Sequence, residues 1–184
     1  MLPPAEGVYA VFEVKPDLQG RVGDDNFFEY TGKKLESVRR LKRTSVKIIN
    51  AGVESKARPL TKIIGGILSS TNSFTHANNN TIETHLKSLK NLQTIELGCA
   101  VDYGSFYVNY KGVENTESRD FEKRILDYYK DRVFESVTFS KKENSLVTFF
   151  LQLTRYLQQT VGTVAAIDLN AYASAVGFTI DESI

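Results

Sequence analysis

The sequence predicts a single domain over residues 1–184 of the α/β class, with a mixed central sheet flanked by helices. Three observations lead to this fold class. Short stretches of β-branched and aromatic residues alternate with longer amphipathic stretches along the chain. A chain of 184 residues is long enough to bury one good hydrophobic core. The sequence shows no internal repeat, low-complexity tract or interdomain linker that would divide it.

The first strand and the first helix are the clearest local predictions. Residues 7–15 alternate with the period of two expected of a strand, and Pro16 should end it because proline cannot donate to a ladder. Residues 17–29 contain several glycines and aspartates and are predicted to form a loop. The stretch "TGKKLESVRRLKR" is then an amphipathic helix that begins at Thr31 or Gly32.

The remaining elements continue the alternation of strands and helices after a loop over 50–60. Each is predicted from its own periodicity or from a capping signal, such as the pair Asn80 and Glu83. They are a buried strand at 61–70, a helix from Asn80, two strands within 92–113 that turn near Tyr103–Gly104, a helix at 117–133, a strand at 134–140, a helix at 144–161 and a last helix within 167–177, capped by Asp168 or Asn170 and ended by Gly177.

The composition argues against several classes of protein. The net charge of +1 points to no particular partner. The single cysteine, Cys99, allows no internal disulfide, which indicates a reducing compartment, and its strand-like surroundings predict a small buried residue. No stretch reaches the roughly 20 apolar residues of a membrane span and no signal-peptide pattern is present, so we expect a cytoplasmic protein without a membrane partner. Two histidines and one cysteine argue against a zinc site.

Positive charge is concentrated in one part of the chain. From Lys33 to Lys62 there are ten lysine or arginine residues and two acids, Glu36 and Glu54. This block is either a solvated helix face followed by a loop, or a surface that faces phosphate groups. On the second interpretation the nucleic-acid-binding residues are Lys33, Lys34, Arg39, Arg40, Lys42 and Arg43.

Three aromatic residues, Phe27, Phe28 and Tyr30, precede the predicted helix. They are expected to pack the loop against the sheet, as hydrophobic staples do at helix starts. The alternative is that they stack on nucleic-acid bases.

Glu13 and Lys15 are charged residues in an otherwise apolar strand, and their spacing places them on one face. A carboxylate there can hold a hard divalent ion, and the Val14 carbonyl offers a second oxygen. The lysine can orient an attacking water and stabilise an anionic transition state, as phosphodiester hydrolysis requires. The alternative is a surface ion pair on an edge strand. Glu-x-Lys alone is a weak signal, because Glu54-Ser55-Lys56 also matches it in a predicted loop.

The order of elements around Glu13 and Lys15 resembles the second half of the core of the PD-(D/E)XK, or restriction-endonuclease-like, nuclease superfamily. In that superfamily one strand carries an aspartate, the next carries (D/E)-x-K, and a helix and another strand follow. The stretches "LPPAEGVYAVFEVKPDL", "GKKLESVRRLKR" and "TVAAIDLNAYASAV" are also similar to an uncharacterised group of bacterial domains assigned to the superfamily. This similarity runs over most of the chain, whereas the superfamily motif covers only residues 13–15 and the following helix.

The resemblance implies metal-dependent hydrolysis of phosphodiester bonds in DNA, in the style of restriction or phage-defence enzymes. Glu13 would be a metal ligand, Val14 a ligand through its carbonyl, and Lys15 the catalytic lysine. Mg²⁺ or Mn²⁺ would be the cofactor, DNA the partner, and the basic residues of the flanking helix would lie beside the site. The alternative is a non-catalytic nucleic-acid-binding or interaction module on the same scaffold.

One part of the superfamily pattern has no match upstream of the motif. The pattern needs an acidic residue well before the glutamate, usually an aspartate on the preceding strand. Only twelve residues precede Glu13, and their sole acid, Glu6, has a spacing that fits poorly. We therefore expect a restriction-endonuclease-like fold that is N-terminally incomplete, as either a fragment of an active nuclease or a degenerate relative. Uncovered strand edges in such a core would favour a homo-oligomer.

Overall fold

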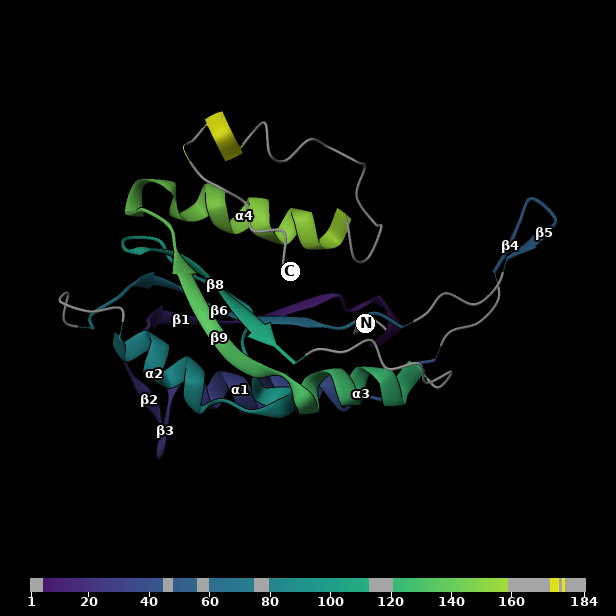
Figure 1. Cartoon of the computed structure of the whole chain (residues 1–184), viewed down its shortest axis with the longest axis horizontal. Helices are drawn as coiled ribbons and strands as arrows, with labels where there is room; N and C mark the ends of the chain where they lie inside the picture. The colour runs from purple at the N-terminus through teal and green to yellow at the C-terminus, as the bar shows by residue number, and fades with distance from the viewer. Residues whose placement is uncertain are drawn as a thin grey trace.

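The computed structural model describes residues 5–44, 48–55, 60–74, 80–112, 121–158, 173–175 and 177. A five-stranded sheet forms the middle layer, with α4 on one side and the other three helices on the opposite side (Figure 1). The helices are α1 (Phe27–Arg39), α2 (Asn80–Ser88), α3 (Phe121–Asp131) and α4 (Ser145–Tyr156), and three short 3-10 turns are η1 (Ala5–Gly7), η2 (Asn91–Gln93) and η3 (Lys142–Asn144).

The central sheet is mixed, as the sequence predicts. Its strands lie in the order β1-β6-β7-β8-β9, with β1, β6 and β7 parallel and β8 and β9 antiparallel to their neighbours. Helix α1 lies in the crossover between the parallel strands β1 and β6. The strands are β1 (Ala10–Asp17), β6 (Ile64–Thr71), β7 (Leu97–Ala100), β8 (Gly104–Lys111) and β9 (Val133–Phe139).

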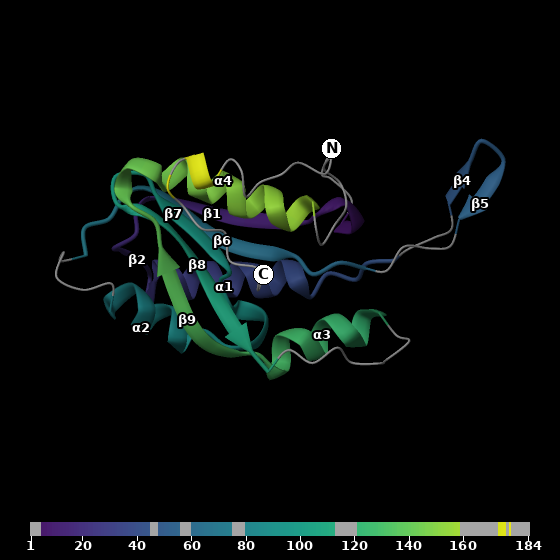
Figure 2. The same cartoon turned by 45° about the horizontal axis from the view of Figure 1, so that its top comes forward.

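Two small hairpins complete the described strands. The first, β2 (Arg21–Val22) with β3 (Asp25–Asn26), comes directly before α1. The second, β4 (Ile48–Asn50) with β5 (Val53–Ser55), lies away from the central sheet in both views (Figures 1 and 2). The first hairpin lies within the predicted loop at 17–29, and the second begins two residues before the predicted loop at 50–60 and continues into it.

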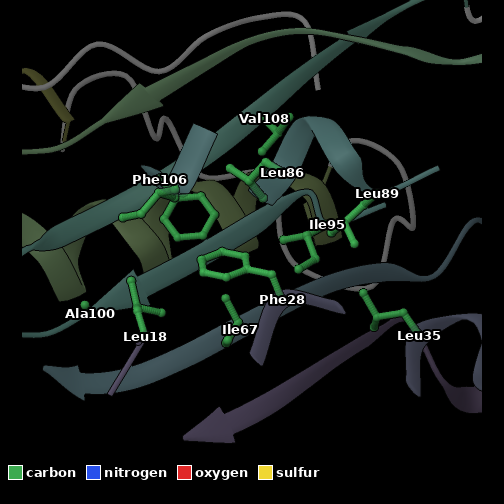
Figure 3. Close-up of a cluster of buried hydrophobic side chains, with 11 residues drawn as sticks. Leu18, Phe28, Leu35, Ile67, Leu86, Leu89, Ile95, Ala100, Phe106 and Val108 are labelled. Atoms are coloured by element: carbon green, nitrogen blue, oxygen red, sulfur yellow. The ribbon is translucent and has the colours of Figure 1, made fainter. Parts of the chain in front are cut away.

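Each face of the sheet buries its own hydrophobic cluster. On the side of α1 and α2, the rings of Phe28 and Phe106 meet with their centroids 6.5 Å apart, at the centre of a cluster that includes Ile67 (Figure 3). On the side of α4, Phe149 packs edge-on against Phe12 of β1. Period-two alternation along β1 thus sends successive side chains into two different cores.

Gly66 permits the close contact between β6 and its neighbours. A Cβ atom built there would lie 2.1 Å from the carbonyl oxygen of Leu97 and 2.6 Å from the ring of Phe12. Backbone cannot yield as a flexible side chain can, so only glycine fits.

Two predicted boundaries are wrong, both close to Glu13 and Lys15. Strand β1 continues through Pro16 to Asp17 instead of ending at Pro16. Helix α1 begins at Phe27, before the predicted start at Thr31 or Gly32. Leu41, which falls within the predicted helical stretch, lies beyond the last turn of α1 and is half exposed.

The other predicted elements agree with the structure where it describes them. The strands at 61–70, 92–113 and 134–140 are confirmed as β6, β7, β8 and β9, and the helices from Asn80, at 117–133 and at 144–161 as α2, α3 and α4. Of the last helix predicted within 167–177, residues 173–175 are described and are helical, whereas its predicted caps, Asp168 and Asn170, lie outside the described residues. Gly177 is described and has a φ of 68°.

Cys99 is confirmed as a small buried residue of the α4-side cluster. Burial raises the pKa of its thiol to about 11, so the side chain is neutral and packs as an apolar group. Among the described residues, no helix is long and apolar enough to cross a membrane.

A buried ion network joins the end of α1 to β6 and to the residues that directly precede β7 and β9. The Glu96 carboxylate accepts a bond from Arg39 at 2.7 Å, one from Arg132 at 2.5 Å and one from the Gly65 amide at 2.6 Å. Burial alone would raise the pKa of Glu96, but Arg132 and Arg39 hold it below its ordinary value. Glu96 is therefore ionised between two arginines in the interior.

Both arginines are held on more than one side. The Arg39 guanidinium also donates to the carbonyl oxygens of Ile63, Leu92 and Thr94. Arg132 lies against aromatic rings, with its guanidinium carbon 4.3 Å from the centroid of Tyr110. These contacts lock α1, η2 and the start of β6 into one arrangement.

Glu96→Gln should reduce the free energy of unfolding at pH 7 by about 3–5 kcal/mol, because it leaves two buried arginines without their anion. The folded-state pKa lies below the ordinary value of 4.5, so this stabilisation is present above pH 4.5 and is lost as the pH falls through the folded pKa. Urea unfolding of both proteins between pH 3 and pH 7 measures this. A gap between wild type and variant that stayed constant through this range would contradict the assignment.

Candidate active site

Glu13 and Lys15 lie side by side on the face of β1 that is turned toward α1. The Nζ atom of Lys15 is 2.7 Å from Oε1 of Glu13, and the two side chains are 14% and 26% exposed. Val11, two residues earlier, packs into the cluster on this same side of the sheet. The predicted shared face is therefore confirmed, and the pair is partly withdrawn from water.

Two aromatic rings from α1 also surround the ammonium group. Nζ of Lys15 lies 4.3 Å from the centroid of Tyr30 and 5.1 Å from that of Phe27. Nζ of Lys34 lies 5.2 Å from the Tyr30 centroid as well. The negative faces of aromatic rings attract cations at such distances. Phe28, the third aromatic of this stretch, is fully buried in the core.

The rings reach Lys15 because of the way α1 begins. Asn26 caps the helix by accepting from the amides of Phe28 and Glu29 at 3.0 Å, and Glu29 accepts from the Asn26 amide at 3.0 Å. This reciprocal pair is a capping box. Tyr30 and Phe27 were not predicted as residues of this site, because the predicted helix begins only after them. The pattern Asn26-x-x-Glu29 is the signal that could have found them.

The open edge of the sheet exposes main-chain oxygen at the same position. Among the described strands, β1 lies at the edge of the sheet and pairs only with β6. The carbonyl of Tyr9 accepts from Ile64 of β6, and residues along a strand alternate in the side to which their backbone groups point. The carbonyl of Val14 therefore lies on the open edge. Pro16 continues the strand because its nitrogen, which has no hydrogen to donate, faces the same open edge.

Asp17 shares the strand face of Glu13 and Lys15 but already has its own partners. Its carboxylate accepts from the hydroxyls of Thr71 and Ser73 and from the amide of Gln19. Slight burial would raise the pKa of Asp17, but the bonds from Thr71, Gln19 and Ser73 outweigh it and lower the pKa. Asp17 thus ties the end of β1 to the segment after β6.

The oxygen donors present suit a hard divalent ion but make up only part of a coordination shell. The Glu13 carboxylate and the Val14 carbonyl are oxygen ligands of the kind that Mg²⁺ and Mn²⁺ prefer. In the part of the chain that the structure describes, no group of three or more His, Cys, Asp or Glu residues could hold a metal ion. The side chain of Glu6, in η1, is outside this description.

The predicted nucleic-acid-binding residues divide into two groups. Lys33, Lys34, Arg40 and Lys42 are exposed along and just beyond α1. Lys33 pairs with Asp25 at 2.6 Å, and this bond raises the pKa of the lysine. Arg40 pairs with Glu36 at 2.5 Å.

Arg39 and Arg43 are buried, with 4% and 7% of their surface exposed. All three guanidinium nitrogens of Arg39 donate hydrogen bonds, to Glu96 or to main-chain carbonyls near it. The structure therefore does not present these two arginines with the exposed cations of α1.

The second Glu-x-Lys sequence has very different surroundings. Glu54 is exposed on β5 of the separate hairpin, and Lys56 lies outside the described residues. Among the described elements, β5 pairs only with β4. Among the described residues, Glu54 therefore has no helix packed over it as α1 packs over Glu13 and Lys15.

Comparison with known proteins identifies nucleases as relatives. The chain is 31% identical over 169 residues to Endodeoxyribonuclease NucC of Escherichia coli (strain MS 115-1), and 29% identical over the same length to Endodeoxyribonuclease NucC of Pseudomonas aeruginosa. Each alignment covers 92% of this chain and 58% of the relative. The chain thus spans less than two thirds of the length of these relatives. No family model matches it.

The fold is shared with a solved NucC structure. The cAAA-bound form of P. aeruginosa NucC matches with a TM-score of 0.63 and 28% sequence identity, over 94% of this chain and 60% of that one. The similarity therefore includes the sheet and the helices described above.

Proposed function

We propose that this chain carries the Glu-x-Lys half of a metal-dependent endodeoxyribonuclease site of the PD-(D/E)XK type. The observation that carries the proposal is the arrangement of β1, where the Glu13 carboxylate, the Lys15 ammonium and the open-edge carbonyl of Val14 occur together. Similarity to two NucC endodeoxyribonucleases supports DNA as the substrate. The proposed reaction is hydrolysis of phosphodiester bonds.

In this proposal each residue of the motif has a separate task. Glu13 and the Val14 carbonyl would hold Mg²⁺ or Mn²⁺ through oxygen. The bound ion would polarise the phosphate and lower the pKa of a water molecule. Lys15 would orient that water and place its positive charge next to the negative charge that develops on the phosphate oxygens.

The exposed cations of α1 would hold the DNA backbone beside the site. Lys33 and Lys34 lie on the helix just after Tyr30, which itself contacts Lys15. Arg40 and Lys42 continue the positive charge just beyond the last residue of the helix. Contacts of this kind give affinity for phosphate without reading the base sequence.

A second candidate function is a non-catalytic nucleic-acid-binding module on the same scaffold. The observation in its favour is that the described residues provide a single acidic side chain at the motif, already paired with Lys15. Such a module would use the same cations of α1 and would need no metal.

We also propose that the chain forms a homo-oligomer, in which a second copy covers the main-chain groups that β6 leaves open on β1 on either side of the Val14 carbonyl. Val14 itself is 69% exposed. Sedimentation of the wild type would test this. A monomer at all concentrations would contradict it.

Glu13→Ala and Lys15→Met should each lower Mg²⁺- or Mn²⁺-dependent cleavage of plasmid DNA by at least about 100-fold. Glu54→Ala, the matched change in the other Glu-x-Lys sequence, should leave cleavage unchanged. The assay is run with and without cAAA, because the solved P. aeruginosa relative binds this molecule. If the wild type cleaves under no condition, yet binds DNA without metal and equally well as Glu13→Ala, the non-catalytic module is the better account.

Alanine substitution of Lys33, Lys34, Arg40 or Lys42 should weaken DNA binding uniformly across sequences. Each lost phosphate contact should reduce the slope of log affinity against log salt concentration by about 1. Fluorescence anisotropy with two duplexes of unrelated sequence at several salt concentrations measures this. Lys141→Ala and Lys142→Ala remove exposed cations away from α1 and should not change the slope. A slope unaffected by all four α1 substitutions would place the DNA elsewhere.

A further inference from the structure

The surroundings of Lys15 contain more than the ion pair with Glu13. Its ammonium nitrogen lies 2.7 Å from a Glu13 oxygen, 4.3 Å from the Tyr30 centroid and 5.1 Å from the Phe27 centroid. The Lys15 side chain is only 14% exposed, so these contacts are largely shielded from water. Cation–π attraction is stronger in such shielded positions than on an open surface.

The ion pair with Lys15 and the proposed metal ion would compete for the same carboxylate of Glu13. The Glu13 oxygens cannot serve a divalent ion fully while one of them is neutralised by Lys15. Once Glu13 gives its oxygens to the ion, Lys15 loses its anionic partner and lies next to a like charge. The remaining contacts of the ammonium group are then the faces of the two rings.

We propose that Tyr30 is a positioning residue for Lys15, with Phe27 in support. The two rings hold the ammonium beside Glu13 when the carboxylate is used for metal binding. This inference rests on the proposed nuclease function. It assigns a role to two residues outside the Glu-x-Lys motif that act on the reaction only through the lysine.

The ring of Tyr30, rather than its hydroxyl, should carry this role. The described residues offer no hydrogen-bond partner to the Tyr30 hydroxyl. Tyr30→Phe keeps the ring and should preserve the position of Lys15. Tyr30→Leu keeps an apolar side chain but removes the ring face, so the lysine loses its nearest aromatic contact.

Steady-state cleavage of plasmid DNA in Mg²⁺ is the first test. Tyr30→Leu should lower kcat by about tenfold while KM for DNA stays within about twofold of wild type. Tyr30→Phe should stay within about twofold of wild type in both constants. Tyr103→Leu removes another half-buried tyrosine, which packs edge-on against Phe139 of β9, and should not change kcat. A Tyr30→Leu protein with wild-type kcat, or equal losses in the Phe and Leu variants, would overturn the proposal.

Side-chain NMR provides a readout that does not depend on cleavage. The ε-CH₂ protons of Lys15, assigned by their loss in Lys15→Met, should be shifted upfield by the rings. This shift should persist in the wild type and Tyr30→Phe at Mg²⁺ concentrations that saturate the change in the Glu13 carboxylate carbon. Tyr30→Leu should lose most of the shift without Mg²⁺. Loss of the shift in the wild type when Mg²⁺ binds would overturn the proposal.

The two measurements separate the failure of this inference from failure of the proposed function. If the wild type does not cleave DNA, the proposed function fails, and the NMR result alone decides whether the rings hold Lys15 next to a metal-bound Glu13. If the Glu13 carbon does not respond to Mg²⁺ at all, no metal competes with Lys15 and the positioning role is overturned as well.

Discussion

The buried carboxylate of Glu96 is the interaction on which the arrangement of the helices depends. It joins Arg39 of α1 to Arg132, which follows α3, and it also accepts from the Gly65 amide of β6. A charged group in the interior is tolerated only when its partners are in place, so these three segments have one favourable arrangement. Arg39 strengthens this by also donating to the main-chain carbonyls of Ile63, Leu92 and Thr94. The last turn of α1 is thereby fixed against the sheet.

The position of the other end of α1 follows from this fixed point. A helix is stiff and rises about 1.5 Å per residue along its axis. Anchoring Arg39 in the last turn therefore also fixes how far along the helix axis the first turn lies. The capping box between Asn26 and Glu29 then fixes where that turn starts. Together the two anchors place the rings of Phe27 and Tyr30 over Lys15. The environment of the lysine thus depends on a charge network at the far end of the same helix.

What the sequence could and could not predict follows from the range of the interactions involved. Period-two alternation identified β1 and the shared face of Glu13 and Lys15, because alternation is a local property of the strand. The end of β1 was missed because Pro16 is tolerated only if its nitrogen faces an open edge, which depends on the pairing with β6. The start of α1 is a local property, because the capping box of Asn26 and Glu29 marks it, but the prediction followed the amphipathic stretch that begins at Thr31 and therefore placed the start too late. Arg39 was grouped with the surface cations because its partner Glu96 is 57 residues away.

The two Glu-x-Lys sequences show why the tripeptide alone predicts so little. Glu54 lies exposed on a two-stranded hairpin, whereas Glu13 lies on an edge strand with a helix packed over its charged face. Only the second setting places a carboxylate, an ammonium and a main-chain carbonyl that no described strand pairs within one short stretch of strand. It also limits where further oxygen ligands could be. Strand β6 occupies one side of β1, so any additional ligand for an ion at Glu13 and Val14 has to approach from the open edge or from the side of α1.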